Sequence, residues 1–382
     1  MTEGVIAPIG DAYQLLELEE GQCDELTVEF AFAHDRIQQA AYALLDETRK
    51  KQAHLRIGRL LLNNLPESRK KERLFDITNH LNLGLKLITD ENEKASLCLL
   101  NLEAGKKARA STANQAACLY LNHALNLLPD EPWQVNYELT LELHTQFAEA
   151  ALLATDYDSM ESRLTAGLAN AKNLLDKVHL YLVQISALIA QGKQREAIDL
   201  GKSVLAQLGH VYPNKPTKAH VIAELMKTMW ALRNVSVETL CQLPEMTDPY
   251  HLAANTIGVR IGAVAMFVEP ELLSMMTLRS SLIQFKHGHC ATAVSAWSVY
   301  GMVLATELNN PEKGLAYGQM AITVAERLNA TLDYPIVVHV HNALVRHWKE
   351  PVRNCIEPLQ TVVNLALDTG NFEYVALAKI VR

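Results

Sequence analysis

The sequence has little that would break or cross-link a chain: its 382 residues include 17 glycines, 13 prolines and six cysteines. Loops must therefore be short or few, because glycine and proline most often punctuate regular structure. The six cysteines are scattered and contain no Cys-x-x-Cys pair. This pattern argues against a disulfide framework and against a zinc site, and it favours reduced thiols in a cytoplasmic protein.

Long apolar runs and an excess of positive charge are also missing. The longest apolar stretch, around residues 261–268, is far shorter than the roughly 20 residues that cross a bilayer. The N-terminus lacks the basic start and apolar block of a secretory signal. The net charge of −8 disfavours nucleic-acid binding, which rests on neutralising phosphates. We expect a cytoplasmic protein with no membrane insertion and no nucleic-acid partner.

What is present is typical of a helical globular chain. Hydrophobic residues make up 49% and charged residues 20%, which excludes a disordered or fibrous protein. The length exceeds what one core usually absorbs, so we expect two or more units.

The N-terminal stretch differs from the rest because its apolar residues alternate. Residues 13–18 and 26–32 are candidate strands around an acidic turn at 19–22, followed by a predicted helix over 35–45. A hairpin and one helix cannot bury an apolar face by themselves. We therefore expect this segment to be the edge of a domain that begins upstream of Met1.

From about residue 47 the apolar residues follow a helical spacing. Leu139, Leu143, Phe147 and Ala151 recur every four residues, and similar stripes run from 160 to 175 and from 197 to 208. One-sided helices must pack on neighbours, and short turns between them give antiparallel helix pairs. The predicted fold class is all-α.

The turns recur near Ser111, Asp156 and Gly192, at intervals comparable to the tetratricopeptide unit of about 34 residues. The clearest copies cover 104–129 and 187–213, and a weaker copy covers 301–328. Small residues allow two helices to approach closely, and a proline ends each of the first two copies. Proline-rich breaks at 212–216 and 243–249 divide the array. We predict a tetratricopeptide-like α-solenoid, with an irregular helical bundle as the alternative.

Two sequence patterns could indicate a binding or catalytic site, but neither is specific. Gly201-Lys202-Ser203 resembles the end of a phosphate-binding loop, but Glu196 stands where that motif needs its first glycine. Gly201 is better explained as a helix-contact residue. Cys98, Cys118 and Cys355 lie on apolar helical stretches and are interpreted as packing residues.

Histidines gather at His287 and His289, beside Cys290, and at His339 and His341, ahead of His347. On a helix, residues i and i+2 point about 200° apart, so neither pair forms a metal site easily. We expect surface or groove histidines, and an all-helical enzyme using His339 or His341 is a minor alternative.

A basic block follows the predicted N-terminal segment. It comprises Arg49, Lys50, Lys51, Arg56, Arg59, Arg69, Lys70, Lys71 and Arg73. Interleaved leucines indicate amphipathic helices. The block is either a solvated face or a docking face for an acidic partner or a preceding domain.

Several strings resemble a large bacterial signalling family. They are FAHDRIQQAAYALL (32–45), HLRIGRLLL (54–62), FDITNHLNLG (75–84), LNLEAGKKARASTANQAACLYLNHALNLLP (100–129), YELTLELHTQFAEAALLATDYDSME (137–161) and QGKQREAIDLGKSVLAQLG (191–209). The family joins a serine/threonine kinase, a STAND-type AAA ATPase, helical repeats, a GAF domain and often a histidine kinase. The resemblance is dense over about 30–210 and looser afterwards.

The resemblance implies an internal piece of such a protein. Its regions would be 1–46, the hairpin and helix that end a winged-helix region; 47–92, basic connecting helices; 93–213, tetratricopeptide-like repeats; and 214–382, degenerate repeats that stop within a helical pattern.

ATP or ADP would bind in the upstream domain, and this chain would hold no cofactor or metal. His34, followed by Asp35, matches the family's His-Asp position, where an imidazole can sense nucleotide phosphates. A helix cap or a hydrogen-bonded core histidine is the alternative.

The function expected from these observations is a regulatory scaffold and not an enzyme. A solenoid presents a long surface that suits a peptide, a protein module or the protein's own ATPase and kinase modules. The alternative is a free-standing tetratricopeptide-type adaptor.

Overall fold

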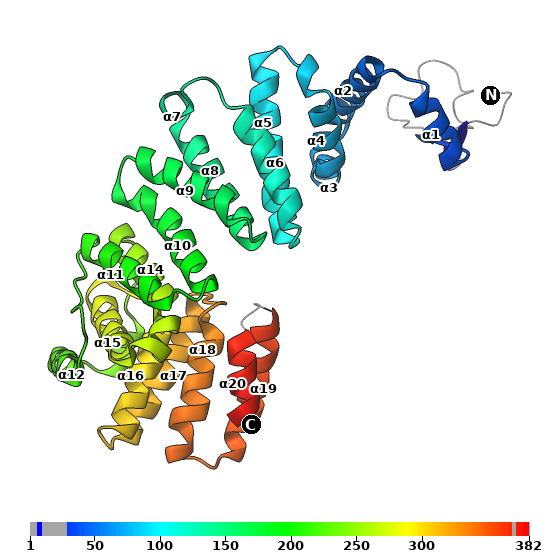
Figure 1. Cartoon of the computed structure of the whole chain (residues 1–382). Coiled ribbons are helices and arrows are strands. Elements are labelled where there is room, and N and C mark those ends of the chain that lie inside the picture. The colour runs from blue at the N-terminus through cyan, green and yellow to red at the C-terminus, as the bar shows by residue number, and fades with distance from the viewer. Residues whose placement is uncertain (1–5, 10–28, 369–371, 382) are drawn as a thin grey trace. The chain divides into compact units, whose positions relative to one another are not determined.

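The computed structural model describes residues 6–9, 29–368 and 372–381, and these are almost entirely helical (Figure 1). The all-helical class predicted from the periodicity is therefore confirmed, apart from one pair of short strands. The chain divides into two compact units, Met1–Ala150 and Ala151–Arg382. The continuous solenoid, the winged-helix origin of the N-terminal segment and the four predicted regions stay predictions.

The N-terminal strands pair differently from the prediction. Strand β2 (Glu29–Phe32) lies within the predicted strand at 26–32, and helix α1 (Asp35–Ala43) follows as expected. Its antiparallel partner is β1 (Ile6–Ile9), with Ile6 opposite Phe32. The predicted partner at 13–18 lies outside the described residues.

The helices of the first unit after α1 form pairs around a leucine-rich core. They are α2 (Glu47–Asn64), α3 (Glu67–Glu72), α4 (Leu74–Leu83), the 3-10 helix Leu85–Leu87, α5 (Glu91–Ala110), α6 (Asn114–Asn126), α7 (Pro132–Val135) and α8 (Tyr137–Leu153), whose end enters the second unit. Asp46 and Asp90 cap α2 and α5 by accepting backbone N–H bonds. Helix α2 packs on α4, and α5 packs on α6.

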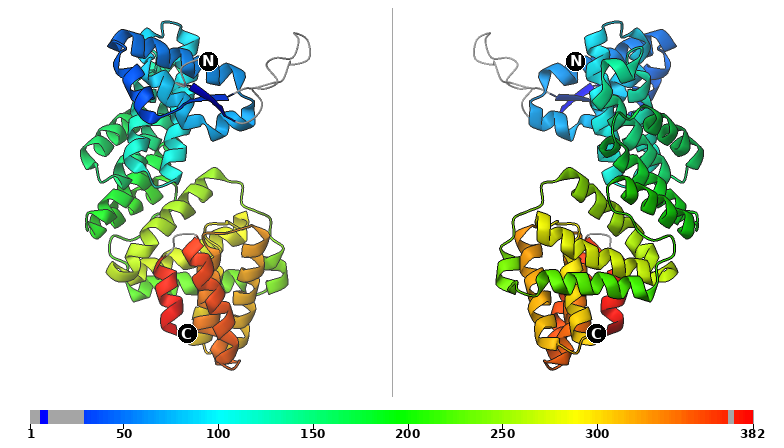
Figure 2. Two further views of the ribbon diagram at one scale, coloured as in Figure 1. Left: turned by 90° about the vertical axis from the view of Figure 1, so that its right-hand side faces the viewer. Right: turned by 90° about the vertical axis from the view of Figure 1, so that its left-hand side faces the viewer.

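The second unit consists of helices throughout its described residues. They are α9 (Tyr157–Asn170), α10 (Leu174–Ala190), α11 (Gln194–Gln207), α12 (Lys218–Leu232), α13 (Val237–Cys241), α14 (Pro249–Val268), α15 (Pro270–His287), α16 (Ser295–Thr306), α17 (Pro311–Arg327), α18 (Tyr334–His339), the π-helical segment Val340–Val345, the 3-10 helix Arg346–Trp348, α19 (Arg353–Asp368) and α20 (Phe372–Val381). Helices α19 and α20 pack on each other and lie side by side in Figure 1 and in the left view of Figure 2. The predicted break at 212–216 falls between α11 and α12, and the break at 243–249 separates α13 from α14, which begins at Pro249. The stripe from 160 to 175, however, is interrupted at 171–173, between α9 and α10.

The three turns predicted from the repeats share one backbone geometry. Thr112, Thr155 and Gly192 each follow a helix with a positive φ, between 59° and 76°. The next residue in each case donates its N–H to a carbonyl five residues back, for example from Ala113 to Ala108 at 2.9 Å. This is the Schellman pattern, which satisfies the last carbonyls of a helix. The recurrence confirms the predicted turns at 111, 156 and 192.

Glycines set the closest helix contacts of the second unit. A Cβ at Gly201 would lie 2.5 Å from Cγ2 of Ile261, so α11 approaches α14 only because residue 201 has no side chain. This confirms Gly201 as a helix-contact residue. In the weaker copy, Gly301 of α16 faces Gly314 of α17, where an added Cβ would meet the opposite backbone oxygen.

Helix α14 is the one helix of the described residues that is long and apolar enough to cross a membrane by length and composition. The apolar stretch at 261–268 is only the end of this helix, which begins at Pro249. In the structure α14 packs against α10, α11 and α15, and its inward residues belong to the core. This packing is that of a core helix.

Candidate functional site

His34 lies at the junction between β2 and α1, as the sequence analysis predicted. It occupies the N-cap position of α1 with φ at −146°, and its side chain makes no capping hydrogen bond. The imidazole and the following Asp35 carboxylate are both exposed. The His34 side chain therefore neither caps α1 by a hydrogen bond nor lies in a buried core. A contact with nucleotide stays a prediction.

The basic block is largely neutralised by neighbouring carboxylates. Arg59 of α2 donates to both carboxylate oxygens of Glu93 at 2.7 Å. Four further members have partners close in sequence: Arg49 with Asp46, Lys50 with Glu47, Lys70 with Glu67, and Arg73 with Asp76. Most of these pairs are exposed, and pairs of this kind contribute little to stability.

The other four members of the block are Lys51, Arg56, Arg69 and Lys71. None of them has a carboxylate within 4 Å among the residues that the structure describes. Arg56 and Arg59 border a shallow groove of about 490 Å³ on α2, together with Leu60 and Leu87. The block is thus divided between α2, α3 and the residue that precedes α4. Its role as a docking face stays a prediction.

A groove of the second unit lies where α17, α18 and α19 meet. Its volume is about 620 Å³. Its wall on α17 includes Leu315 and Gln319, and its wall on α19 includes Pro358 and Thr361. Volumes of this size suit small ligands or peptide side chains.

The polar side of this groove comes from the π-helical segment and the residues after it. His341 is 5% exposed and packs against Gly318 of α17, where any side chain would collide with the imidazole. Burial lowers the pKa of His341 to about 4, so the ring is neutral near pH 7. Its Nδ1 has no hydrogen-bond partner among the described residues.

Arg346 lies beside His341 and is held by three acceptors. Its guanidinium donates to Glu350 at 2.9 Å, to the Asn342 amide oxygen at 3.1 Å and to the Asn354 carbonyl at 3.0 Å. The hydrogen bonds to Asn354 and Arg346 lower the pKa of Glu350. The groove therefore offers neutral and paired hydrogen-bonding groups, which suits binding of a polar ligand better than nucleophilic chemistry. π-helical turns often occur at functional sites.

The predicted histidine groups separate in the structure. His341 lines the groove and His347 is exposed, as expected. His339 is buried against Tyr374 of α20, so the expectation of a surface or groove position was wrong for this residue. The cause is the helical spacing, which turns His339 and His341 to different sides.

His289 is also buried. Its Nδ1 accepts a hydrogen bond from Trp297, and its Nε2 donates one to the Leu240 carbonyl. His287 instead joins a cluster that sequence order did not reveal. Its ring lies 4.0 Å from that of His251, whose Nδ1 is 3.3 Å from Nε2 of His210. Among the described residues, no group of three or more His, Cys, Asp or Glu side chains is arranged to hold a metal ion.

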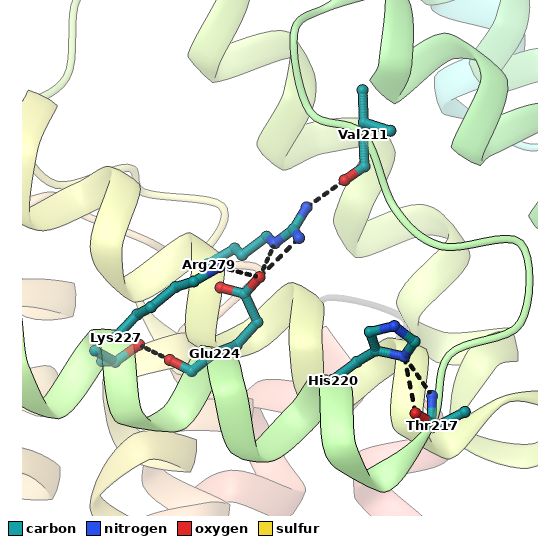
Figure 3. Close-up of polar contacts among 7 residues, drawn as sticks. Val211, Thr217, His220, Glu224, Lys227 and Arg279 are labelled. Carbon is teal, nitrogen blue, oxygen red and sulfur yellow. Dashed lines mark hydrogen bonds and ion pairs between the residues drawn. The ribbon is translucent and has the colours of Figure 1, made fainter.

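A second feature that the sequence analysis missed is the attachment of α12. Glu224 of α12 is buried and accepts hydrogen bonds from Arg279 of α15 at 2.7 and 3.0 Å (Figure 3). Arg279 also donates to the Val211 carbonyl and lies 4.5 Å from the Tyr212 ring. Burial raises the pKa of Tyr212 to about 12, so its phenol stays protonated. These contacts join α12, α15 and the loop that precedes α12.

The described cysteines form no disulfide with one another, and two of the three expected packing residues are buried. Cys98 and Cys355 lie within the helical core, and burial raises the pKa of the Cys98 thiol to about 11. A thiol of this kind is a poor nucleophile at neutral pH. Cys118 is half-buried, and Cys23 lies outside the described residues.

Comparison with known proteins gives one partial similarity to report. The chain is 32% identical over 169 residues to "Hybrid signal transduction histidine kinase G" of Dictyostelium discoideum. The similarity covers 38% of this chain, which spans only 5% of that relative's length. No protein-family model matches the chain. The similarity places part of this chain in a signal-transduction context and assigns no activity to it.

Proposed function

We propose that this chain is a non-catalytic regulatory segment of a larger cytoplasmic signalling protein. The observation that carries the proposal is the 32% identity to a small part of a signal-transduction histidine kinase. The helix pairs support it, because stacked helices provide extended surfaces for protein partners. In this role the segment contacts other modules differently in their active and inactive states, as any allosteric regulator must.

The finer form of the proposal assigns the chain to the STAND-type AAA ATPases linked to kinase and GAF modules. The basis is the resemblance of residues 30–210. ATP or ADP then binds in the upstream ATPase domain, and the helical segment contacts the ATPase or kinase modules of the same polypeptide.

The proposal is tested with the isolated chain and the kinase or ATPase module of the same polypeptide. The module's autophosphorylation and ATP turnover are measured with and without the chain added in trans, and binding is measured in parallel. We expect binding and a change in at least one rate. A module that neither binds the chain nor changes its rates would contradict the proposal.

His34 gives a sharper test of the STAND assignment. Replacing His34 with alanine in the intact ATPase should alter nucleotide affinity or turnover, because an exposed imidazole at this junction is free to donate to a phosphate. Ala33→Ser is a matched control at the neighbouring exposed position. Unchanged affinity and turnover in His34→Ala would exclude sensing by His34.

The second candidate is a free-standing adaptor that binds a separate protein. The 620 Å³ groove beside His341 favours it, since that groove is complete within the second unit. The two candidates differ in the partner. A regulatory segment binds its own ATPase or kinase module, whereas an adaptor binds a different polypeptide.

A further inference from the structure

Helix α12 exposes a stripe of large apolar side chains. Ile222 is 56% exposed, Met226 65%, Met229 40% and Trp230 68%. Their positions, i, i+4, i+7 and i+8, place all four on one face of the helix. We call these four residues the α12 outer face. Soluble chains seldom expose several large apolar side chains together unless the patch binds something.

The opposite face of α12 is fixed to the rest of the second unit. Leu232 belongs to a buried core cluster, with Val221 and Leu225 packed against it. Thr228 is fully buried, and Glu224 is held by Arg279 (Figure 3). The start of the helix is fixed by a capping box between Thr217 and His220. The outer face therefore cannot turn inward without breaking a buried ion pair and leaving the core.

The exposed charged residues that α12 and its C-cap contribute beside the outer face are basic. Lys218 lies at one end of the stripe and Arg233 at the other, and Lys227, exposed along its side, is paired with the inward-pointing Glu224 at 3.3 Å. The single acidic residue of α12, Glu224, points inward, with only 6% of its side chain exposed. The Arg233 guanidinium lies 4.2 Å from the Trp230 ring centroid, which extends the apolar surface with a cationic edge.

We propose that the α12 outer face binds an amphipathic helix of a partner protein whose apolar ridge is flanked by acidic residues. The helical spacing of the four side chains matches the ridges and grooves of a second helix. Tryptophan, methionine and arginine are the side chains most enriched in protein interfaces, and methionine adapts to varied partners. The basic rim selects acidic flanks and speeds their association.

A second copy of this chain and a lipid surface fit the α12 outer face less well. In a symmetric pair of this chain, two basic rims would face each other. A lipid surface is met most often by helices with leucine, phenylalanine and tryptophan on the buried side, whereas two of these four side chains are methionines. The proposal concerns a surface separate from the groove beside His341, and it holds for a regulatory segment as well as for an adaptor.

The test is a selection from a displayed library of helical peptides with randomised apolar and flanking positions, with the full chain as bait. We expect enriched peptides to carry apolar residues at helical spacing flanked by Asp or Glu. The best peptide should lose about tenfold or more in affinity for Met226→Glu, because this change puts a charge in the centre of the face. Leu119→Glu is the matched control, since Leu119 is 66% exposed on a helix of the first unit. Circular dichroism should show both variants folded.

Three outcomes would overturn the proposal. The first is a selection that enriches no peptide, or that enriches peptides without acidic flanks. The second is binding that Met226→Glu leaves unchanged. The third concerns a different association of the chain, measured as binding to phosphatidylcholine–phosphatidylserine vesicles or as dimer formation in sedimentation. It occurs if Met226→Glu abolishes that association while the peptide affinity stays the same. The vesicle result would assign the face to a lipid surface, and the dimer result to a second copy of this chain.

Discussion

Single glycines determine how closely the helices of the second unit approach each other. At Gly201 the nearest atoms to an added Cβ belong to Ile261, so a larger residue would push α11 away from α14. We expect Gly201→Leu to lower the free energy of unfolding by about 1–3 kcal/mol through overpacking. Urea denaturation followed by circular dichroism measures this loss. Ser203→Ala, at an exposed position of the same helix, should change it by less than about 0.5 kcal/mol.

A second substitution separates the packing effect from a general loss of stability. Ile261→Ala alone should cost about 2–4 kcal/mol, because it removes a fully buried side chain. Combined with Gly201→Leu, the total loss should fall short of the sum by about 1 kcal/mol, since the leucine occupies the space that Ile261 vacates. Strictly additive losses would show that the two residues do not share one packing site.

The buried His341 makes stability depend on pH. Because its pKa is lowered from 6.5 to about 4 in the folded chain, the unfolded chain binds more protons between these values. Stability should therefore decrease as the pH falls from about 6.5 to 4, with roughly 3 kcal/mol attributable to this residue. The loss is complete below pH 4, where both states are protonated.

The contribution of His341 is isolated by comparing the chain with His341→Gln over the same pH range. Other buried histidines, His289 among them, have lowered pKa values and contribute to the slope of both proteins. The difference between the two denaturation profiles should be flat above pH 6.5 and should change between pH 6.5 and 4. Parallel profiles would contradict a lowered pKa at His341.

At the scale of the element, the turns after α5, α8 and α10 offer a stabilising substitution. Thr112 is β-branched and exposed, yet its φ is +60°, a conformation that favours glycine. Thr112→Gly should raise the free energy of unfolding by about 0.5–1 kcal/mol, because the strain of the left-handed conformation disappears. Thermal denaturation of the intact chain measures the gain.

Ser111→Gly is the matched control for this turn. Ser111 has a negative φ, and its hydroxyl donates to the Lys107 carbonyl. Glycine at this position should destabilise the turn slightly, since it removes that hydrogen bond and relieves no strain. If Thr112→Gly were no more stable than Ser111→Gly, the left-handed conformation at residue 112 would not carry a cost.

The sequence predicted these elements well where the signal was local. Turns at 111, 156 and 192 and the proline breaks were predictable, because residues close in sequence decide them. Strand β1, which pairs with β2, was not predicted, since strand pairing depends on residues that are distant in sequence. The break between α9 and α10 contains no glycine or proline, so the apolar stripe continued across it.

The candidate sites were also hard to predict, because they depend on residues that are distant in sequence. The apolar stripes identified in the sequence did not include the α12 segment, and helical periodicity cannot tell which apolar face meets a neighbour and which stays exposed. The groove beside His341 depends on contacts between α17 and residues more than twenty positions later. The only available signal was the cluster of His339, His341 and His347, and it could not separate the buried imidazole from the one that lines the groove.

At the scale of the whole molecule, each of the two compact units contains buried core clusters of its own. The buried cluster around Leu55, Ile77 and Leu97 lies within the first unit. Three larger clusters lie within the second, around Ile257, Trp297 and Val362. A unit with its own core is expected to fold alone. We therefore expect residues 151–382, produced without the rest of the chain, to fold cooperatively.

Tryptophan fluorescence provides the measurement, because the fully buried Trp297 reports on the core of the second unit, whereas Trp230 and Trp348 of the same unit are exposed in the folded chain. Replacing Trp133 with phenylalanine in the intact chain removes the tryptophan of the first unit, so its fluorescence then comes from the second unit alone. The urea midpoint of the fragment should match that of this variant, since the same core unfolds in both. A fragment with exposed tryptophan emission and no cooperative transition would show that the core clusters of the second unit do not suffice for folding, and that residues 1–150 are part of the same cooperative structure.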